Sequence, residues 1–138
     1  MKIVVSACLL GENCKYNGGN NYCPKVAAFV EGKEVLPVCP EMAAGFGCPR
    51  IPMEIVNGRL INREGKDLQE AMEAAITNIL AQLEGQDIQC AVLKSRSPTC
   101  GVRQVYDGTF SGTLIPGMGL FAAALHKQGI SVVDSEEI

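Results

Sequence analysis

The chain has 138 residues, of which 47% are hydrophobic, and its formal net charge is −3. This length favours one domain over residues 1–138 with a real buried core, and the composition excludes a disordered chain. The basic residues are scattered, so no basic stripe indicates duplex nucleic acid or a membrane surface. No apolar run approaches the roughly 18 residues of a membrane span, and no signal peptide precedes the first strand, so we expect a cytoplasmic protein.

Cysteine is unusually frequent, with seven residues in this short chain. An odd number leaves at least one thiol outside any set of disulfides, and disulfides are uncommon in the cytoplasm. Metal, cluster or thiol chemistry is therefore a candidate role for some of them. The alternative is that several of these cysteines are small buried hydrophobes.

The first half of the chain begins with a predicted strand over residues 3–7 and a loop over 9–22 that is rich in glycine and asparagine. Pro24 suits the first turn of a helix that ends before Gly32. A second strand over residues 34–38 leads, through Pro40, into a glycine- and proline-rich loop over 42–52. Asn57-Gly58 then predicts the turn of a hairpin over residues 53–62.

The second half contains the longest predicted helix, over residues 66–84, with apolar residues at helical spacing and Gly85 at its end. A third strand is expected over residues 88–93, and Asp107-Gly108 predicts a second hairpin between 103–106 and 109–110. Gly117-Met118-Gly119 precedes a helix over 120–128 and only weakly resembles a phosphate cradle. The last strand is predicted over residues 130–133.

This alternation predicts an α/β fold, in the form of a single-domain, three-layer, Rossmann-like or flavodoxin-like parallel sheet with two small hairpins. We expect the strand order 2-1-3-4, hairpins not counted, because it places a switch point beside strand 1. Strands 2, 1 and 3 are then neighbours, and each leads into a cysteine: Cys39, Cys8 and, after a turn-rich segment, Cys100. Ligands of open α/β sheets bind at this edge.

Cys8, Cys39 and Cys100 form the main candidate site. Thiolates suit zinc and iron–sulfur clusters, but the Cys-x2-Cys pairs of structural zinc sites and the contiguous ferredoxin spacing are both absent. Spacing alone therefore leaves a metal or cluster site and plain buried thiols both open. Three ligands would leave one position open, which is the catalytic arrangement. Among the remaining cysteines, Cys90 is expected in the core, and three others lie in loops where each is a fourth ligand or a plain thiol: Cys14, Cys23 and Cys48.

Several polar residues accompany these cysteines. Glu41 is the carboxylate attached directly to a cysteine-bearing strand end, where it either carries a proton in catalysis or caps a helix. The hydroxyl residues that lead into Cys100 either serve the site or satisfy turn amides. Arg50 follows Pro49 and either orients a polar substrate or lies on the surface. The only histidine, His126, falls in the last turn of the final helix and receives no catalytic role.

Three motifs together resemble a known family. They are Ser6-Ala7-Cys8-Leu9-Leu10-Gly11, Val38-Cys39-Pro40-Glu41, and Leu93-Lys94-Ser95-Arg96-Ser97-Pro98-Thr99-Cys100-Gly101 with Tyr106-Asp107-Gly108-Thr109-Phe110. As a set they resemble the small bacterial family that includes the iron–sulfur-dependent thiouracil desulfurases. The resemblance implies a 4Fe-4S cluster on Cys8, Cys39 and Cys100, with an acidic residue and a serine, Glu41 and Ser97, assisting. The chain departs from the family pattern at Asn17, where the family commonly has an aspartate.

The resemblance implies an enzyme that removes sulfur from a thiolated pyrimidine, such as 2-thiouracil, or from a related small thiocarbonyl. Water activated by Glu41 would attack the carbon, and the sulfur would be captured on the open iron as hydrosulfide. We predict catalytic roles for Glu41, Ser97 and Lys94, and substrate binding by Arg50 and Ser95.

The alternative is a non-catalytic iron–sulfur or zinc protein that acts in electron or sulfur transfer. Such a carrier would have four ligands, the fourth from Cys14 or Cys48. The physiological substrate, the fate of the sulfur and the oligomeric state stay open at this stage.

Overall fold

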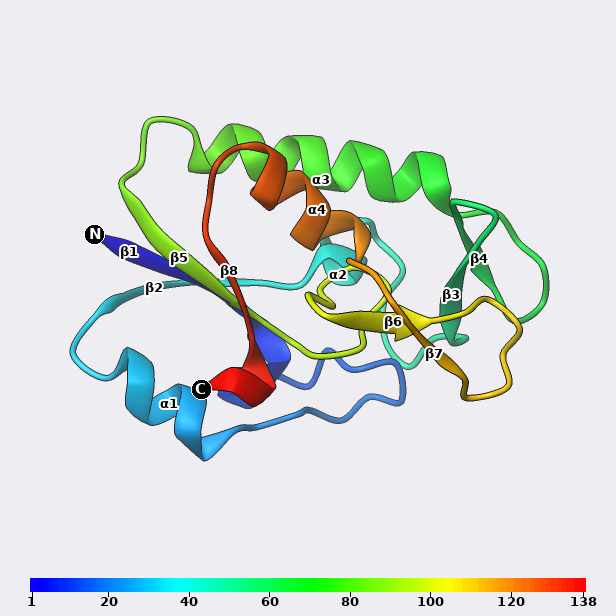
Figure 1. Cartoon of the computed structure of the whole chain (residues 1–138), viewed down its shortest axis with the longest axis horizontal. Coiled ribbons are helices and arrows are strands. Elements are labelled where there is room, and N and C mark those ends of the chain that lie inside the picture. Colours follow the sequence, from blue (N-terminus) through cyan, green and yellow to red (C-terminus); the bar gives the residue numbers. More distant parts are fainter.

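The computed structural model describes residues 1–138 as a parallel sheet with helices on both faces and two small hairpins at one end (Figure 1). The sheet strands are Lys2–Ser6 (β1), Glu34–Val38 (β2), Ile88–Leu93 (β5) and Val132–Asp134 (β8). Their order is β2-β1-β5-β8, and every neighbouring pair is parallel. The predicted α/β fold and the order 2-1-3-4 are therefore confirmed.

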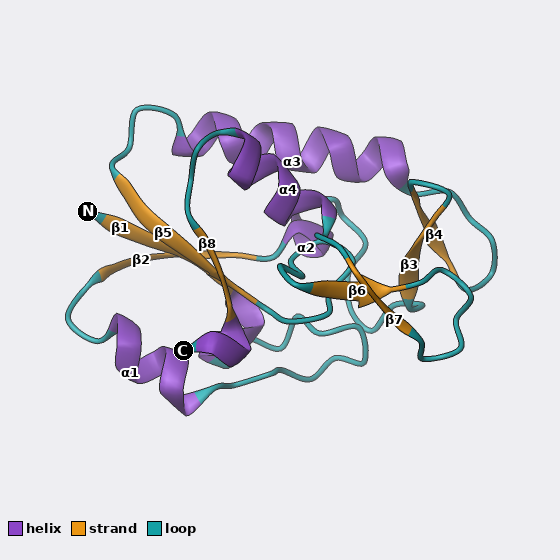
Figure 2. Ribbon diagram, in the orientation of Figure 1, coloured by secondary structure: helices purple, strands orange, loops and turns teal.

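The helices form the outer two layers (Figure 2). Gln69–Leu83 (α3) and Leu120–Lys127 (α4) lie over one face of the sheet, and Pro24–Val30 (α1) lies on the other with the 3₁₀ turns Ala7–Leu10 and Ser135–Glu137. Successive strand side chains point to opposite faces. Val4 of β1 accordingly belongs to the cluster of α3 and α4, whereas Ile3 and Val5 pack with Val26 of α1.

Helix α3 buries the apolar face that its sequence predicts: Met72, Ala75, Ile76, Ile79 and Leu83. It begins three residues later than expected, because the backbone of residues 66–68 hydrogen-bonds to the second strand of the first hairpin. The Leu68 N–H donates to the Leu60 carbonyl oxygen there. Gly85, with φ +79°, follows the helix end in the left-handed conformation that suits glycine.

The first hairpin pairs Met53–Val56 (β3) with Arg59–Asn62 (β4), and its turn is Asn57-Gly58 as predicted. Both turn residues have positive φ, +49° and +79°. This is the conformation that a two-residue hairpin of the type I′ class requires.

The predicted second hairpin is wrong in its return strand. Gln104–Tyr106 (β6) pairs with Leu114–Pro116 (β7), not with residues 109–110. Asp107-Gly108 starts a longer loop, because the Gly108 backbone packs against β3. A Cβ at Gly108 would lie 2.5 Å from the Ile55 carbonyl oxygen.

Two smaller differences lie beside the candidate site. Pro40 opens a short helix, Pro40–Ala43 (α2), rather than a loop, which suits proline in a first helical turn. The predicted phosphate cradle is not formed, because the N–H groups of Gly119, Leu120 and Phe121 already donate to the carbonyl oxygens of the preceding turn. None of the helices combines the length and apolar character needed to cross a membrane.

Candidate functional site

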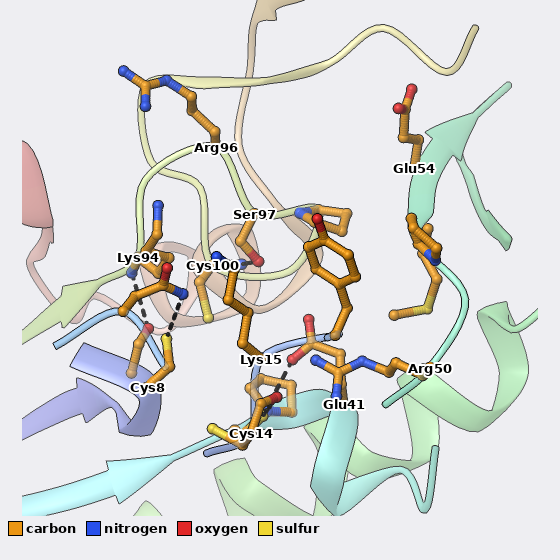
Figure 3. Close-up of a pocket in the computed structure, with 18 of the residues that line it drawn as sticks. Cys8, Cys14, Lys15, Glu41, Arg50, Glu54, Lys94, Arg96, Ser97 and Cys100 are labelled. Atoms are coloured by element: carbon orange, nitrogen blue, oxygen red, sulfur yellow. Dashed lines mark hydrogen bonds between the residues drawn. The ribbon is translucent and has the colours of Figure 1, made fainter. Parts of the chain in front are cut away.

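A cavity of about 500 Å³ opens where the carboxyl ends of β1, β2 and β5 meet the two hairpins. This volume suits a small-molecule site. All the residues predicted for the site line this cavity, and Figure 3 shows most of them reaching into it. They are Cys8, Cys39, Glu41, Arg50, Lys94, Ser95, Ser97 and Cys100.

The three candidate ligands come from three different strand ends. Cys8 lies in the 3₁₀ turn after β1, Cys39 is the N-cap residue of α2 directly after β2, and Cys100 lies in the turn that follows β5. Cys100 is 4% exposed, and the other two are half-buried. Figure 3 shows the side chains of Cys8 and Cys100 extending into the same space. Chain segments that are far apart in the sequence thus deliver thiols to one cavity.

Burial strongly affects the protonation of these thiols. It raises the pKa of Cys100 to about 12, with the nearby Glu41 carboxylate as the second cause. Burial and Glu41, in the same order, also raise the pKa of Cys39 far above its usual range. For Cys8, burial raises the pKa, and a hydrogen bond from Asn21 Nδ2 to Sγ, at 3.4 Å, opposes it. Without a metal the three groups are neutral thiols, so metal binding must displace their protons.

The donor set fits a cluster better than a single ion. No group of three or more histidine, cysteine, aspartate and glutamate side chains is gathered closely enough to ligate one metal ion. In an iron–sulfur cluster, separate thiolates bind separate irons. The three thiols come from three different strand ends around one cavity, so each is free to bind a separate iron, and all seven cysteines are unpaired.

Glu41 lies in the first turn of α2 and is only 7% exposed. Its Oε1 accepts a hydrogen bond from Thr99 Oγ1 at 2.5 Å, and its Oε2 accepts one from Cys39 Sγ at 3.5 Å. The sequence left open whether the hydroxyl residues before Cys100 serve the site or satisfy turn amides, and it did not predict this contact between Thr99 and Glu41. A hydroxyl residue directly before Cys100 was the available signal.

Ser97 combines a structural contact with a position in the cavity lining. Its Oγ accepts hydrogen bonds from the backbone N–H groups of Thr99, at 3.2 Å, and Cys100, at 3.0 Å. It therefore satisfies turn amides, and it also lines the cavity. The turn that presents Cys100 is thus built around the Ser97 hydroxyl.

Lys94 and Ser95 form a wall beside Cys8. The Lys94 backbone N–H donates to Ser6 Oγ at 2.9 Å, and its Nζ donates to both the carbonyl oxygen and Oγ of Ser95 at 3.0 Å. Burial lowers the pKa of the Lys94 ammonium. Sequence reasoning missed Ser6, which joins the end of β1 to the end of β5.

Arg50 lies on the opposite side, after the loop that follows α2. Its backbone N–H donates to the Tyr16 carbonyl oxygen at 2.6 Å, and Nη1 donates to the Gly47 carbonyl oxygen at 2.9 Å. Its Nε is buried without a partner. A buried donor without a partner is costly, so an acceptor that reaches it would bind favourably.

An aromatic wall, which sequence reasoning missed, closes the hairpin side of the cavity. Tyr106 and Phe110 line it, and the Arg63 guanidinium lies 5.9 Å from the centre of the Phe110 ring. Glu54 Oε1 accepts hydrogen bonds from the backbone N–H groups of Gly108, at 3.0 Å, and Phe110, at 3.1 Å. Such a wall suits a flat ring.

The remaining cysteines are placed differently. Cys14 is buried, lines the cavity, and has a carbonyl oxygen 3.9 Å from Cys39 Sγ. Cys48 is not part of the cavity lining, and its Sγ donates to the Asn13 carbonyl oxygen. Cys90 is buried within the β1–α1 cluster, as expected. Cys14 is thus the remaining thiol within the cavity.

The fold and cavity describe an α/β protein with a thiol-lined site, and comparison with known proteins identifies its family. Residues 3–137 match the family described as 2-thiouracil desulfurase. The chain is 34% identical to the uncharacterized protein YbbK of Bacillus subtilis strain 168, over 99% of this chain and 97% of that protein. The chain therefore belongs to the 2-thiouracil desulfurase family, which confirms the resemblance drawn from its motifs.

A solved structure agrees with this assignment. The 4Fe-4S-dependent thiouracil desulfidase TudS superposes with a TM-score of 0.91 and 32% sequence identity, covering 99% of this chain and 92% of that chain. The fold of this chain is therefore shared with a 4Fe-4S-dependent thiouracil desulfidase.

Proposed function

We propose that this protein is a 4Fe-4S-dependent desulfurase that removes sulfur from a thiolated pyrimidine of the 2-thiouracil type. The observation that carries the proposal is the meeting of Cys8, Cys39 and Cys100 in one cavity. Membership of the 2-thiouracil desulfurase family and the match to TudS support the same reaction.

Cys8, Cys39 and Cys100 would hold the cluster through their thiolates. With three protein ligands, a bound cluster would supply a Lewis-acidic iron with an open position and an affinity for soft sulfur. Cys100 is itself shielded from solvent, with 4% of its surface exposed. Asn21, through its hydrogen bond to Cys8 Sγ, orients that ligand.

The walls of the cavity orient the substrate. Phe110 and Tyr106 offer a surface for the flat pyrimidine ring. Lys94 uses two of its three ammonium hydrogens on Ser95, which leaves one for a substrate oxygen. The Ser95 hydroxyl accepts from Lys94 and so keeps its own hydrogen to donate. Arg50 supplies donors from the other side.

Glu41 handles the proton transfer from water, and Ser97 assists by supporting the turn beside it. The overall reaction breaks the carbon–sulfur double bond, forms a carbon–oxygen double bond, and turns one water into the carbonyl oxygen and the two hydrogens of hydrogen sulfide. No oxidant or reductant is consumed. Glu41, acting as general base, takes a proton from the attacking water. Ser97 holds the adjacent turn in place and borders the same space.

The second candidate function is a cluster-bearing carrier of electrons or sulfur. It is favoured by one observation, that Cys14 lies buried within the same cavity as the three proposed ligands. A fourth thiolate would remove the open position that a desulfurase needs.

We place this activity in the cytoplasm, on a small thiolated base rather than on duplex nucleic acid, within a single domain over residues 1–138. The seven unpaired cysteines suit a reducing compartment, and the net charge of −3 does not favour binding to phosphate backbones.

The direct test is anaerobic reconstitution followed by assay with 2-thiouracil. Protein with a full complement of iron and sulfide should release uracil and hydrogen sulfide in equal amounts, whereas metal-free and zinc-loaded protein should release neither. Uracil formation by metal-free protein would exclude cluster dependence. A loaded enzyme that releases no sulfide from thiolated pyrimidines would overturn the desulfurase assignment in favour of a carrier.

A further inference from the structure

Thr99 is the one residue whose side chain hydrogen-bonds to both Glu41 and Ser97, although it is absent from the cavity lining. It is fully buried. Its Oγ1 donates to Glu41 Oε1 and lies 3.1 Å from Ser97 Oγ. Because it does not reach the cavity, any influence on the reaction must pass through Glu41 and Ser97.

The hydrogens on these hydroxyl groups can be placed by elimination. A threonine hydroxyl has one hydrogen, and an ionised carboxylate can only accept. The Thr99 hydrogen therefore points at Glu41, since the Cys100 sulfur is a weak acceptor at 3.8 Å. The contact between Ser97 and Thr99 must then use the Ser97 hydrogen. The hydrogen bonds run in one direction, from Ser97 to Thr99 to Glu41.

Cluster binding would increase the dependence of Glu41 on Thr99. In the structure the second carboxylate oxygen accepts a hydrogen bond from the Cys39 thiol. A metal-bound thiolate has no hydrogen, so Cys39 as a ligand cannot make this bond. Thr99 is then the remaining side-chain donor to the Glu41 carboxylate.

The backbone of Thr99 is itself held firmly. Its carbonyl oxygen accepts hydrogen bonds from the N–H groups of Phe121, at 2.8 Å, and Ala122, at 3.0 Å, in the first turn of α4. Gly119 packs against the same peptide and leaves no room for a Cβ. A rigid helix end therefore fixes the hydroxyl.

We propose that Thr99 is a positioning residue, whose hydroxyl holds the Glu41 carboxylate and the Ser97 hydroxyl in their reactive orientation once Cys39 has become a ligand. This inference rests on the proposed function, because it concerns the groups assigned to water activation. Positioning differs from a packing role, since the methyl group of Thr99 would serve packing without the hydroxyl.

The first test compares Thr99→Val, which keeps the shape and removes the hydroxyl, with Thr99→Ser, which keeps the hydroxyl. Thr77→Val, an exposed site on α3, is the matched control. We expect Thr99→Val to lower kcat by about 10²-fold with KM within about twofold, the scale of a misplaced catalytic group. Thr99→Ser should restore most of kcat, and iron content and the cluster absorption should stay unchanged throughout.

Three outcomes would overturn the proposal. One is a fully loaded Thr99→Val enzyme whose kcat is within twofold of the wild-type value. Another is an equal loss of kcat in Thr99→Val and Thr99→Ser, which would show that Thr99 acts through packing. A third is iron loss in Thr99→Val alone, which would make Thr99 a support for Cys100. If the valine variant does not fold, Thr99→Ala compared with Thr99→Ser answers the same question.

A second test uses metal-free protein and needs no activity. The melting temperatures of Thr99→Val, Glu41→Ala and the double variant form a cycle that isolates their interaction. If the hydroxyl holds the carboxylate, the double variant should lose less than the sum of the single losses. Additive losses would overturn the proposal. A wild-type protein without desulfurase activity would overturn the proposed function instead. The cycle would still show whether Thr99 and Glu41 interact.

Discussion

Oε1 of Glu54 accepts a hydrogen bond from the backbone N–H of Phe110 at 3.1 Å, across 56 positions of sequence. Phe110 has φ +56°, a backbone conformation that is unfavourable for an aromatic residue. The bond to Glu54 helps to hold this conformation, and Phe110 lines the cavity. One buried carboxylate on β3 therefore keeps the loop over residues 107–113 in place as a wall of the site.

Replacing Glu54 should therefore loosen the aromatic wall formed by Tyr106 and Phe110, without affecting the cluster. We expect Glu54→Ala to raise KM for 2-thiouracil about tenfold, equivalent to about 1.4 kcal/mol, with iron content unchanged. Glu54→Gln retains an acceptor oxygen and should stay within about threefold of the wild-type KM. Hydrogen exchange of the loop amides provides the direct measurement, and unchanged protection in Glu54→Ala would contradict this role.

The three candidate ligands should be separable from the buried thiols. Single Cys→Ser variants at Cys8, Cys39 and Cys100 should each fail to retain a stable cluster in iron and sulfide analysis. Cys90→Ser should keep its iron and lose only stability, by about 1–3 kcal/mol for the buried hydroxyl. Cluster loss in Cys90→Ser together with retention in Cys100→Ser would show that the ligand assignment is wrong.

Cys14 should be dispensable if the cluster has three protein ligands. Cys14→Ser should then keep its iron content and a turnover within about threefold of wild type, while any loss of stability reflects packing. Loss of cluster iron in this variant would identify Cys14 as a fourth ligand and favour the carrier function.

Glu41→Gln preserves the shape of the side chain and removes its capacity as a base. General acid–base assistance is typically worth about 10²–10⁴ in rate, so kcat should fall by that factor at near-normal KM and normal iron content. The absorption spectrum of the cluster is the control. Turnover that survives within about threefold would make Glu41 structural, and iron loss would make it a ligand or a support for α2.

Gly119 should be intolerant of a side chain because it packs on the Thr99 peptide beside Cys100. Gly119→Ala should reduce stability by about 1–3 kcal/mol, as overpacking does, and lower cluster retention. Gly117→Ala is the matched control, since a Cβ there would meet Val105 Cγ2 at an ordinary 3.4 Å. Thermal melts and iron analysis of both variants provide the comparison, and equal behaviour would argue against this packing role.

The return strand of the second hairpin could not be predicted from the local sequence. Asn57-Gly58 and Asp107-Gly108 are equivalent turn signals, yet only the first forms a two-residue turn. At Gly108 the backbone bonds to Glu54 and packs against Ile55, so a distant strand outweighs the local preference. The return strand consequently forms at Leu114–Pro116.

The order of the elements, the parallel sheet, the motifs that resemble the desulfurase family and the candidate site residues could all be predicted from the amino-acid sequence. These follow from periodicity, turn chemistry and crossover rules, which act over short stretches of chain. The pairing of side chains within the site could not be predicted in this way. Glu41 and Thr99 are 58 positions apart, and their hydrogen bond exists because α2 and the turn before Cys100 meet at neighbouring strand ends. Such a pairing depends on how whole elements pack together, which no local pattern records.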